Sequence, residues 1–308
     1  MIGYFVRRIL WLIPVLVVIS VITFGLMHAV PGNPFDKADK PLPEQLLKRL
    51  MAHYQLDKPV YTQYVMYMVN AVRGDLGPSY QYMNRTVNQI IAESFPKSIT
   101  LGIMGIVVAL IIGVPLGIVA AVRHNTAMDY LSMFIALIGV SVPAMTMASV
   151  LIWLFALKLG ILPVARWGSV QQAILPVFTL GVGGAAILAR LTRASLLQVL
   201  REDYIRAARA KGVSERKVIG RHALRNALIP VVTVLGPMTA AMLTGSLIVE
   251  RIFAIPGLGK FYVESVNVRD YPMIMGTTLL YAFVLVAANF VVDITYYWID
   301  PRIKLGKN

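Results

Sequence analysis

The stretch SITLGIMGIVVALIIGVPLGIVAAV, Ser98–Val122, carries no charged side chain over its whole length. A helix needs about 20 apolar residues to cross the ~30 Å hydrocarbon core of a bilayer, so this run is long enough to span it. A helix also pairs its backbone polar groups internally, which lipid requires. The stretch therefore predicts a transmembrane helix. Apolar runs before and after it determine how many further transmembrane helices the sequence predicts.

The composition of the whole chain points the same way. Of its 308 residues, 57% are hydrophobic and 14% are charged, whereas roughly a quarter of the residues are charged in an average soluble domain. Further apolar runs predict spans at Ile9–Val30, Tyr130–Leu157, Ile174–Ala189, Val231–Val249 and Met273–Tyr296. We therefore expect an all-α membrane protein with six transmembrane helices.

The predicted chain has four parts. These are a first transmembrane helix with the N-terminus (1–30), an outer helical segment between the first two spans (31–97), a core of five helices that contains the loop 190–230 (98–297), and a C-terminal tail (298–308). The fourth span is short and rich in glycine and alanine, so it either packs inside the bundle, where small residues allow close approach, or faces lipid. Breaker residues at 113–117, 141–143 and 236–237 mark places where spans could bend, with static kinks as the alternative.

The distribution of Arg and Lys predicts the orientation. With the N-terminus inside, the cytoplasmic segments hold sixteen basic residues and the two short outer loops hold five. This positive-inside bias places both termini in the cytoplasm, and the first apolar run is too long for a cleaved signal peptide. The net charge of +14 could suggest nucleic acid, but it gathers beside the spans, so the bilayer explains it better. With no cysteine, neither a disulfide framework nor a thiolate metal site is possible.

The outer segment contains helical patterns of its own. Apolar residues at helical spacing predict helices that start at Pro43-Glu44, over Tyr61–Arg73 and over Val87–Ser94, and tyrosines are frequent between them. Tyrosine is enriched at membrane–water interfaces. The segment is therefore either a cap on the outer leaflet or a docking surface for an external partner.

The loop that follows the fourth span is the most basic part of the chain. Between Arg190 and Ile229 it has ten Arg or Lys against three acidic residues. A helix is predicted from Asp203 to Lys211, with Gly212 as the left-handed residue that ends it. Ser214 can cap a second helix over Arg216–Arg225. The charges could serve topology alone, bind anionic lipid, or dock a partner.

Several motifs now identify a resemblance. Residues Arg206–Gly212 (RAARAKG) resemble the EAA loop of permease subunits in binding-protein-dependent ABC importers, and the run Asp203–Gly236 looks like the peptide/nickel branch. Further similar stretches are FVRRILWLIPVL (Phe5–Leu16), PGNPF (Pro31–Phe35), GDLGPSY (Gly74–Tyr80), ERIFAIPGLGK (Glu250–Lys260), RDYPM (Arg269–Met273) and DPRI (Asp300–Ile303). The chain is most similar to the B-type subunits of oligopeptide or dipeptide permeases. It departs from the general EAA pattern at Arg206, where many relatives have Glu, and at Pro230, which lies later than in sugar permeases.

The resemblance implies a type I ABC importer permease fold in the bacterial cytoplasmic (inner) membrane. The partners it implies are a second homologous permease subunit in a heterodimer, two ATPase subunits that bind ATP and magnesium, and an external peptide-binding protein. The resemblance also implies that six residues couple the permease to the ATPase: Asp203, Arg206, Ala207, Ala208, Ala210 and Gly212. The chain has no GxxxxGK[ST] motif, so we expect a non-catalytic subunit without a cofactor of its own.

The solute and its path are less constrained. Short peptides are the expected cargo; a nickel chelate, glutathione or a murein peptide stays open, and a secondary transporter is a weaker alternative because midplane charges and an internal repeat are missing. Path residues are expected at Ser141, Met145, Met238, Thr239 and Thr244, since methionine adapts to varied side chains, although plain packing is the alternative. Asp293 either pairs near the end of the last span or relays protons. No metal-ligand pair or nucleophile motif occurs.

Overall fold

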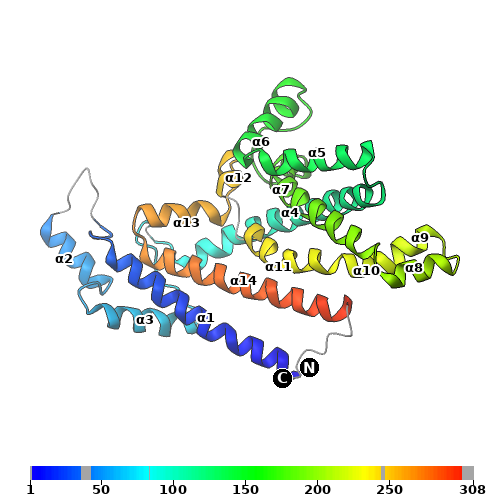
Figure 1. Cartoon of the computed structure of the whole chain (residues 1–308). Coiled ribbons are helices and arrows are strands. Elements are labelled where there is room, and N and C mark those ends of the chain that lie inside the picture. Colours follow the sequence, from blue (N-terminus) through cyan, green and yellow to red (C-terminus); the bar gives the residue numbers. More distant parts are fainter. Residues whose placement is uncertain (1, 36–42, 83, 244–246, 300–308) are drawn as a thin grey trace. The chain divides into compact units, whose positions relative to one another are not determined.

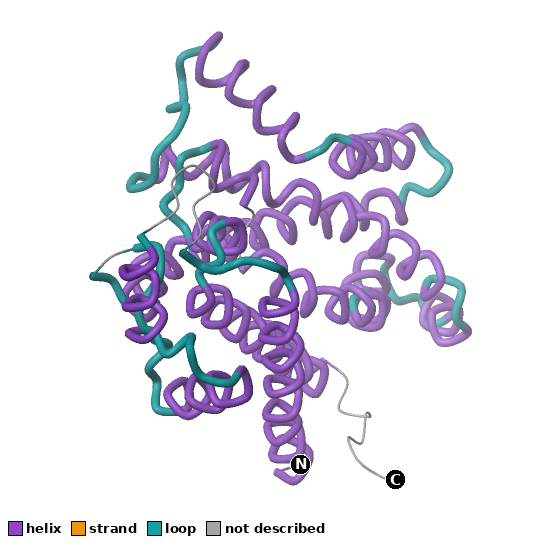
Figure 2. The backbone as a smooth tube through the Cα atoms, turned by 90° about the vertical axis from the view of Figure 1, so that its left-hand side faces the viewer, coloured by secondary structure: helices purple, strands orange, loops and turns teal. Residues whose placement is uncertain are grey.

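A computed structural model describes residues 2–35, 43–82, 84–243 and 247–299 (Figure 1). These residues form helices joined by loops, as the purple tube of Figure 2 shows, and their one isolated bridge pairs Pro78 with Thr86. The helices of the first half are α1 (Ile2–Ala29), α2 (Glu44–His53), α3 (Val60–Val72), α4 (Val87–Val122), α5 (Ala127–Ser141), α6 (Ala144–Leu151) and the π-helix η1 (Ile152–Lys158). Those of the second half are α7 (Val170–Val199), α8 (Asp203–Ala210), α9 (Glu215–Lys217), η2 (Val218–Ala223), α10 (Leu224–Ala227), α11 (Ile229–Leu243), α12 (Leu247–Ile252), α13 (Leu258–Asn267) and α14 (Tyr271–Ile299).

Five helical stretches are long and apolar enough to cross a membrane. They are Leu12–Ala29, Val87–Val122, Val170–Val199, Ile229–Ile252 and Tyr271–Val292. A sixth candidate is the pair Ala127–Ser141 and Ala144–Lys158, which is bent by 106° between its two halves. The predicted all-helical membrane fold is therefore confirmed, with one span of different form.

The third predicted span, Tyr130–Leu157, is a broken helix. Val142 has an extended backbone with ψ 119° and Pro143 follows it. Proline disfavours the helical conformation of the residue before it, so α5 ends and α6 begins in a new direction. A bend at 141–143 was among the sequence expectations. The breakers at 113–117 and 236–237, by contrast, lie inside α4 and α11 without ending them.

The short helix predicted at Val87–Ser94 is part of a longer one. It continues through Pro96 into the second span, so that α4 runs for 36 residues. The fourth span also exceeds its predicted length. Ser169 and Gln172 form a capping box that starts α7 well before Ile174, and the helix then runs to Val199.

The chain forms two compact units, and residues 98–256 with 285–308 make up the second. Within it α7 is the central helix, with 56% of its most apolar window buried, which confirms that the fourth span packs inside. One face of α7 lies against glycines of α4. A Cβ added at Gly113 would lie 2.4 Å from the carbonyl oxygen of Ala185, and one at Gly117 would lie 2.5 Å from that of Ala189. The two backbones are therefore in direct contact.

This contact makes a testable prediction. Gly113→Ala forces α4 away from α7 and should cost about 1–3 kcal/mol of stability, as overpacking in a filled core does. Gly183→Ala, on α7 two residues before Ala185, is the control because its Cβ would meet the nearest atom at an ordinary 3.8 Å. Thermal unfolding of the purified variants in detergent measures the difference. Equal midpoints for the two variants would contradict the close α4–α7 contact.

Residues 1–97 with 257–284 form the first unit. Its α2 and α3 lie close to the predicted positions, and the start of α14 is fixed by a buried carboxylate. Asp270 is 1% exposed and accepts hydrogen bonds from the Ser79 hydroxyl, from the backbone N–H of Gln81 at 3.2 Å and from that of Met273 at 3.3 Å. The GDLGPSY and RDYPM stretches are thus held together by one side chain.

Candidate functional site: the basic loop between α7 and α11

The structure confirms how the first helix of the basic loop ends. α8 covers Asp203–Ala210, and Gly212 follows with φ +74°. The N–H of Gly212 donates to the Arg209 carbonyl at 2.9 Å, and the N–H of Val213 donates to the Ala208 carbonyl at 3.2 Å. This pair of bonds is the Schellman motif, which requires the left-handed conformation that glycine adopts without strain.

The second half of the loop differs in detail from the predicted helix. It is helical from Glu215 to Ala227, but the middle segment η2 has π-helical geometry. Ser214 stands at the cap position without a side-chain hydrogen bond, so the expected cap is wrong. The side-chain bond at this end of the helix is made by Glu215, whose carboxylate is bound by Arg209.

The loop has a small core of its own. Ile205, Val218, Ala223 and Ala227 are fully buried, and Ala208 packs against them. Five of the six predicted coupling residues are exposed, and four of these five lie on α8: Asp203, Arg206, Ala207 and Ala210. Their spacing places them on one side of α8, where residues three and four apart are neighbours. Ala208 is the exception to the expected alanine surface, because it faces inward.

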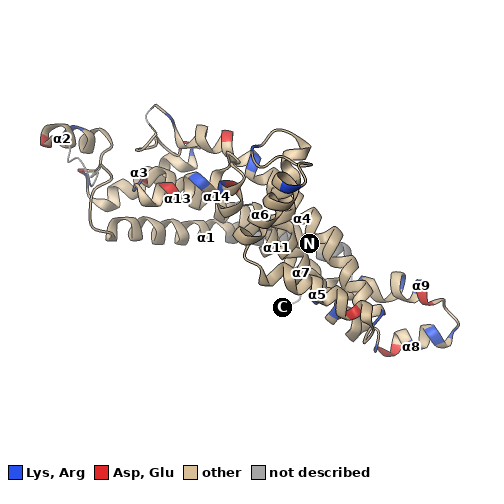
Figure 3. Ribbon diagram, turned by 90° about the horizontal axis from the view of Figure 1, so that it is seen from above, with Lys and Arg blue, Asp and Glu red and all other residues tan. Residues whose placement is uncertain are grey.

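Figure 3 shows α8 and α9 beyond the ends of α5 and α7, with Lys and Arg on their surfaces. Two side-chain contacts join α8 to the second helical half of the loop, residues 215–227. Arg209 binds Glu215 through two parallel bonds of 3.1 and 2.6 Å, and Asn226 donates to the Tyr204 hydroxyl at 2.7 Å. The hydrogen bond from Arg209 lowers the pKa of Glu215, although partial burial opposes it. Where α7 meets α8 there is an open hollow of about 500 Å³ that includes Arg201, Asp203 and Arg206 in its lining.

A second ionic cluster lies where the loop joins the helices, and sequence reasoning missed it. Asp129, at the start of α5, is 1% exposed. Arg193 of α7 binds both its oxygens, at 2.7 and 2.8 Å, and Nδ1 of His124 lies 3.1 Å away. The signal in the sequence was an acidic residue at the edge of an apolar run, while Arg193 was counted as one of the loop's surface charges.

Comparison with known proteins places this arrangement in a family. The profile described as "Binding-protein-dependent transport system inner membrane component" matches residues 113–305. A second, described as "Binding-prot-dependent transport system membrane comp, N-term", matches residues 1–102. The chain belongs to this permease family. The predicted family membership is thereby confirmed, and with it a multi-pass protein of the inner membrane.

Individual relatives are similar over their whole length. The dipeptide transport system permease protein DppB of Bacillus subtilis is 46% identical over 99% of this chain and 98% of its own. The oligopeptide permease protein OppB of Salmonella typhimurium is 39% identical, over 99% of this chain and 100% of its own. The glutathione permease protein GsiC of Escherichia coli is 44% identical, over 99% of each chain.

A solved structure supports the fold. A chain of the inward-facing MetNI methionine ABC transporter aligns with a TM-score of 0.57 at 19% identity, over 69% of this permease and 97% of that chain. This similarity confirms the predicted type I ABC importer permease fold. At that level of identity it carries no information about the solute.

The predicted path residues of the permease have different surroundings. Ser141 ends α5 and Met145, 57% exposed, lies just after the break. Met238 packs against α7, where its sulfur would lie 3.2 Å from a Cβ added at Gly184. Thr239 is partly buried on α11, whereas Thr244 and the side chain of Asp293 lie outside the described residues. Among the residues that the structure describes, no group of three His, Cys, Asp or Glu could hold a metal ion.

The Arg209–Glu215 pair allows a prediction about the loop. Both side chains are about half exposed, and such pairs contribute roughly 0.2–1 kcal/mol. Arg209→Gln should therefore speed hydrogen exchange of the Gly212–Val213 amides by up to about five-fold, measured by mass spectrometry. Lys211→Gln removes one positive charge from the same turn and is the control.

The pH dependence of this effect has a defined sign. A carboxylate with a lowered pKa contributes stability above its unfolded pKa and loses it only as the pH falls through the folded value. Glu215 therefore stays ionised near neutral pH, and the difference between Arg209→Gln and the unmodified chain should be the same at about pH 6 and pH 8. A difference that vanished on going from pH 8 to pH 6 would contradict the assigned pair.

Proposed function

We propose that this permease is the non-catalytic membrane subunit of an ATP-driven importer that passes short peptides from an external binding protein across the cytoplasmic membrane. The observation that carries the proposal is 46% sequence identity to a dipeptide permease over 99% of this chain. The exposed side of α8 and the ordered turn at Gly212 agree with a docking role. A loop that served only topology or lipid binding would need no such turn.

The partners follow from this proposal. Two ATPase subunits bind ATP and magnesium, and α8 docks on them through Asp203, Arg206, Ala207 and Ala210. Closure of the ATPase pair then moves the spans between inward-open and outward-open states, a rigid-body switch driven by different contacts in the two states. A second, homologous permease subunit completes the path as a heterodimer. This chain itself binds no cofactor.

Co-purification and uptake test the proposal together. The tagged chain, solubilised gently from cells that carry its whole operon, should bring down an ATPase and a second permease. The same cells should accumulate a radiolabelled dipeptide, and a strain lacking this chain should not. If no ATPase accompanies the chain under any gentle condition, the importer assignment is wrong.

Glutathione is the second candidate solute, because a glutathione permease is 44% identical over the full length. Competition distinguishes the two. Excess unlabelled dipeptide should suppress dipeptide uptake strongly, and excess glutathione should suppress it little. The reverse order would assign the chain to glutathione instead.

The orientation has its own test. The chain has no cysteine, so single cysteines can be introduced without a background. With both termini in the cytoplasm, Lys217→Cys should react with a membrane-impermeant maleimide only after the cells are opened, whereas Gln81→Cys should react in intact cells. Labelling in the opposite order would invert the topology.

A further inference from the structure

The helix α3 has an exposed apolar stripe along one side. Tyr61, Val65, Val69 and Val72 are 74%, 55%, 46% and 84% exposed. They follow one another at intervals of three and four residues, so they form one line on the helix surface. No residue of α3, VYTQYVMYMVNAV, is charged. A continuous apolar surface of this kind marks a contact with a membrane or with another protein.

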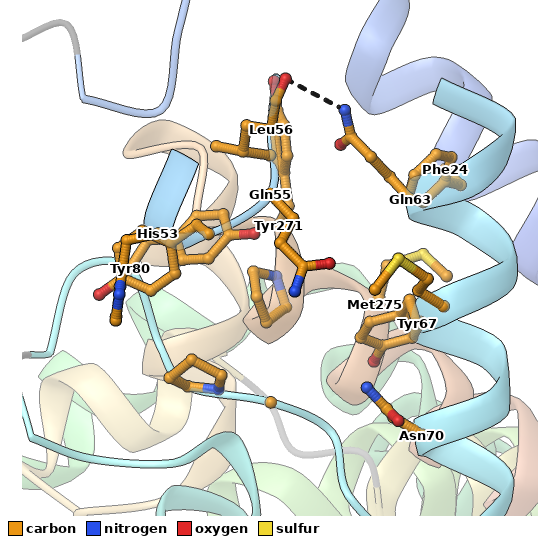
Figure 4. A pocket seen from close by; sticks show the side chains of 15 residues that line it. Phe24, His53, Gln55, Leu56, Gln63, Tyr67, Asn70, Tyr80, Tyr271 and Met275 are labelled. Carbon is orange, nitrogen blue, oxygen red and sulfur yellow. Dashed lines mark hydrogen bonds between the residues drawn. The ribbon is translucent and has the colours of Figure 1, made fainter. Parts of the chain in front are cut away.

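The opposite side of α3 faces the unit to which the helix belongs. Figure 4 shows Tyr67 and Asn70 directed from α3 towards a cavity of about 210 Å³ within this unit. Gln63 lies on the same side and donates to the Leu56 carbonyl oxygen at 3.2 Å, the dashed line in Figure 4. The stripe therefore points away from the rest of the unit.

The neighbouring helix α2 has a different composition. Its ten residues include Glu44, Lys48 and Arg49, and the first two form an exposed ion pair. Charged side chains are costly in the hydrocarbon core, so α2 is suited to water. The charges next to α3, on Lys58 and Arg73, lie just outside its two ends. Within α3 itself, no charged side chain opposes burial in lipid.

Contacts with α1 give the depth of α3. From Ile9 to Ala29 the sequence of α1 has no Lys, Arg, Asp or Glu, and a helix of this length rises about 30 Å, the thickness of the hydrocarbon core. The hydroxyl of Ser20, near the middle of this run, lies 2.8 Å from the Tyr64 hydroxyl. The rings of Phe24 and Tyr64 pack edge to face, with centroids 5.3 Å apart. Figure 1 shows the two helices side by side.

These contacts lie below the end of the span. Phe24 comes five positions before Ala29, which is about 8 Å along the helix. Helices that lie in the membrane interface insert to about 5–10 Å below its boundary, so the depth of α3 falls in that range. A soluble partner would have to reach the stripe at a depth where lipid surrounds α1.

The free surface of α1 near this contact is apolar as well. Val21, Ile22 and Leu26 are 52%, 55% and 63% exposed. They alternate along the helix with the residues that contact α3, so α3 rests against a span whose uncovered side chains are suited to lipid. The Tyr64 hydroxyl is hydrogen-bonded to Ser20, as a polar group needs when it is buried away from water.

We propose that α3 is embedded in one leaflet of the bilayer, at the end of α1 that carries Ala29, with its exposed stripe against the lipid acyl chains. Of the two alternatives for the segment between the first two spans, this one assigns α3 to the membrane and leaves α2 in water. Tyr61, at the start of the stripe, is the type of residue enriched at the headgroup level. The placement does not depend on which solute is transported.

Collisions of spin labels with oxygen and with a nickel chelate test this placement. Apolar oxygen concentrates in hydrocarbon, whereas the polar chelate stays in water. The chain has no cysteine, so Val65→Cys and Val69→Cys can each be labelled alone, in the complex purified with its partner subunits in nanodiscs. At both positions the ratio of oxygen to nickel collision rates should be several times that of Lys48→Cys on α2, whose side chain is 75% exposed. All three positions are exposed, so the label should leave the fold intact.

Three other outcomes would each overturn the proposal. Labels on α3 that collide with nickel, and become protected when the external binding protein is added, would make the stripe a docking surface. Labels shielded from both reagents would place it against a second permease subunit. Equal ratios for Val65→Cys and Lys48→Cys would place α3 in water. If no partner co-purifies, so that the proposed function fails, the labelled chain alone in nanodiscs still reports whether α3 lies in lipid.

Discussion

Replacing Gly212 by valine is expected to abolish peptide uptake while the chain still inserts into the membrane. Gly212 has φ +74°, and a Cβ at this position would meet nothing within 4 Å. A side chain at this position is therefore disfavoured only by the left-handed backbone conformation and not by a steric contact. A β-branched residue in the left-handed region costs roughly 1–3 kcal/mol. The turn should relax to a different conformation, lose the two bonds that end α8, and move the exposed side of α8 away from its docking position.

Two further variants separate this cause from a general effect of added bulk. Gly212→Asn should retain most of the uptake, since asparagine tolerates the left-handed conformation better than other residues. Gly220→Val places the same side chain in the same loop, also in open space but without a left-handed backbone, and should be tolerated. Uptake of a radiolabelled dipeptide, normalised to the amount of chain in the membrane, is the measurement. Normal transport by Gly212→Val would show that this turn does not couple to the ATPase.

Local features of the loop were readable from the sequence because they depend on neighbouring residues. Helix-forming residues from Asp203 onward and a glycine at the right position predict α8 and its end, and the structure has both. The inward position of Ala208 was not readable. It depends on Val218 and Ala223, which return to α8 only after the chain has turned at Gly212. The π-helical geometry of η2 has no sequence signal of its own.

For the transmembrane spans, too, local features could be predicted from the sequence and distant contacts could not. Apolar length predicts where helices cross, and Pro143 predicts the break in the third. The merging of the outer helix with the second span was missed: α4 continues through Pro96, although proline usually interrupts the interior of a helix. Contacts between distant residues were missed altogether. Asp129 and Arg193 are 64 residues apart, and composition cannot show that one neutralises the other.

That pair carries the second large prediction. Arg193→Met should destabilise the permease by about 3–5 kcal/mol, because it leaves the buried carboxylate of Asp129 without its counter-charge. The thermal midpoint of the purified protein in detergent should fall by on the order of 10 °C. Arg190→Met removes an exposed arginine one turn earlier on the same helix and should change the midpoint little.

The double variant decides whether the loss is electrostatic. Asp129→Asn together with Arg193→Met removes both charges, and a buried ion pair replaced as a whole often costs little. The double variant should therefore be more stable than Arg193→Met alone, although the buried amide of the asparagine must still find hydrogen-bond partners. His124, 3.1 Å from the same carboxylate, cannot replace the guanidinium fork, since it reaches only one of the two oxygens that Arg193 binds. If the double variant is as unstable as the single one, the stabilisation comes from packing of the arginine side chain between α5 and α7 and not from its charge.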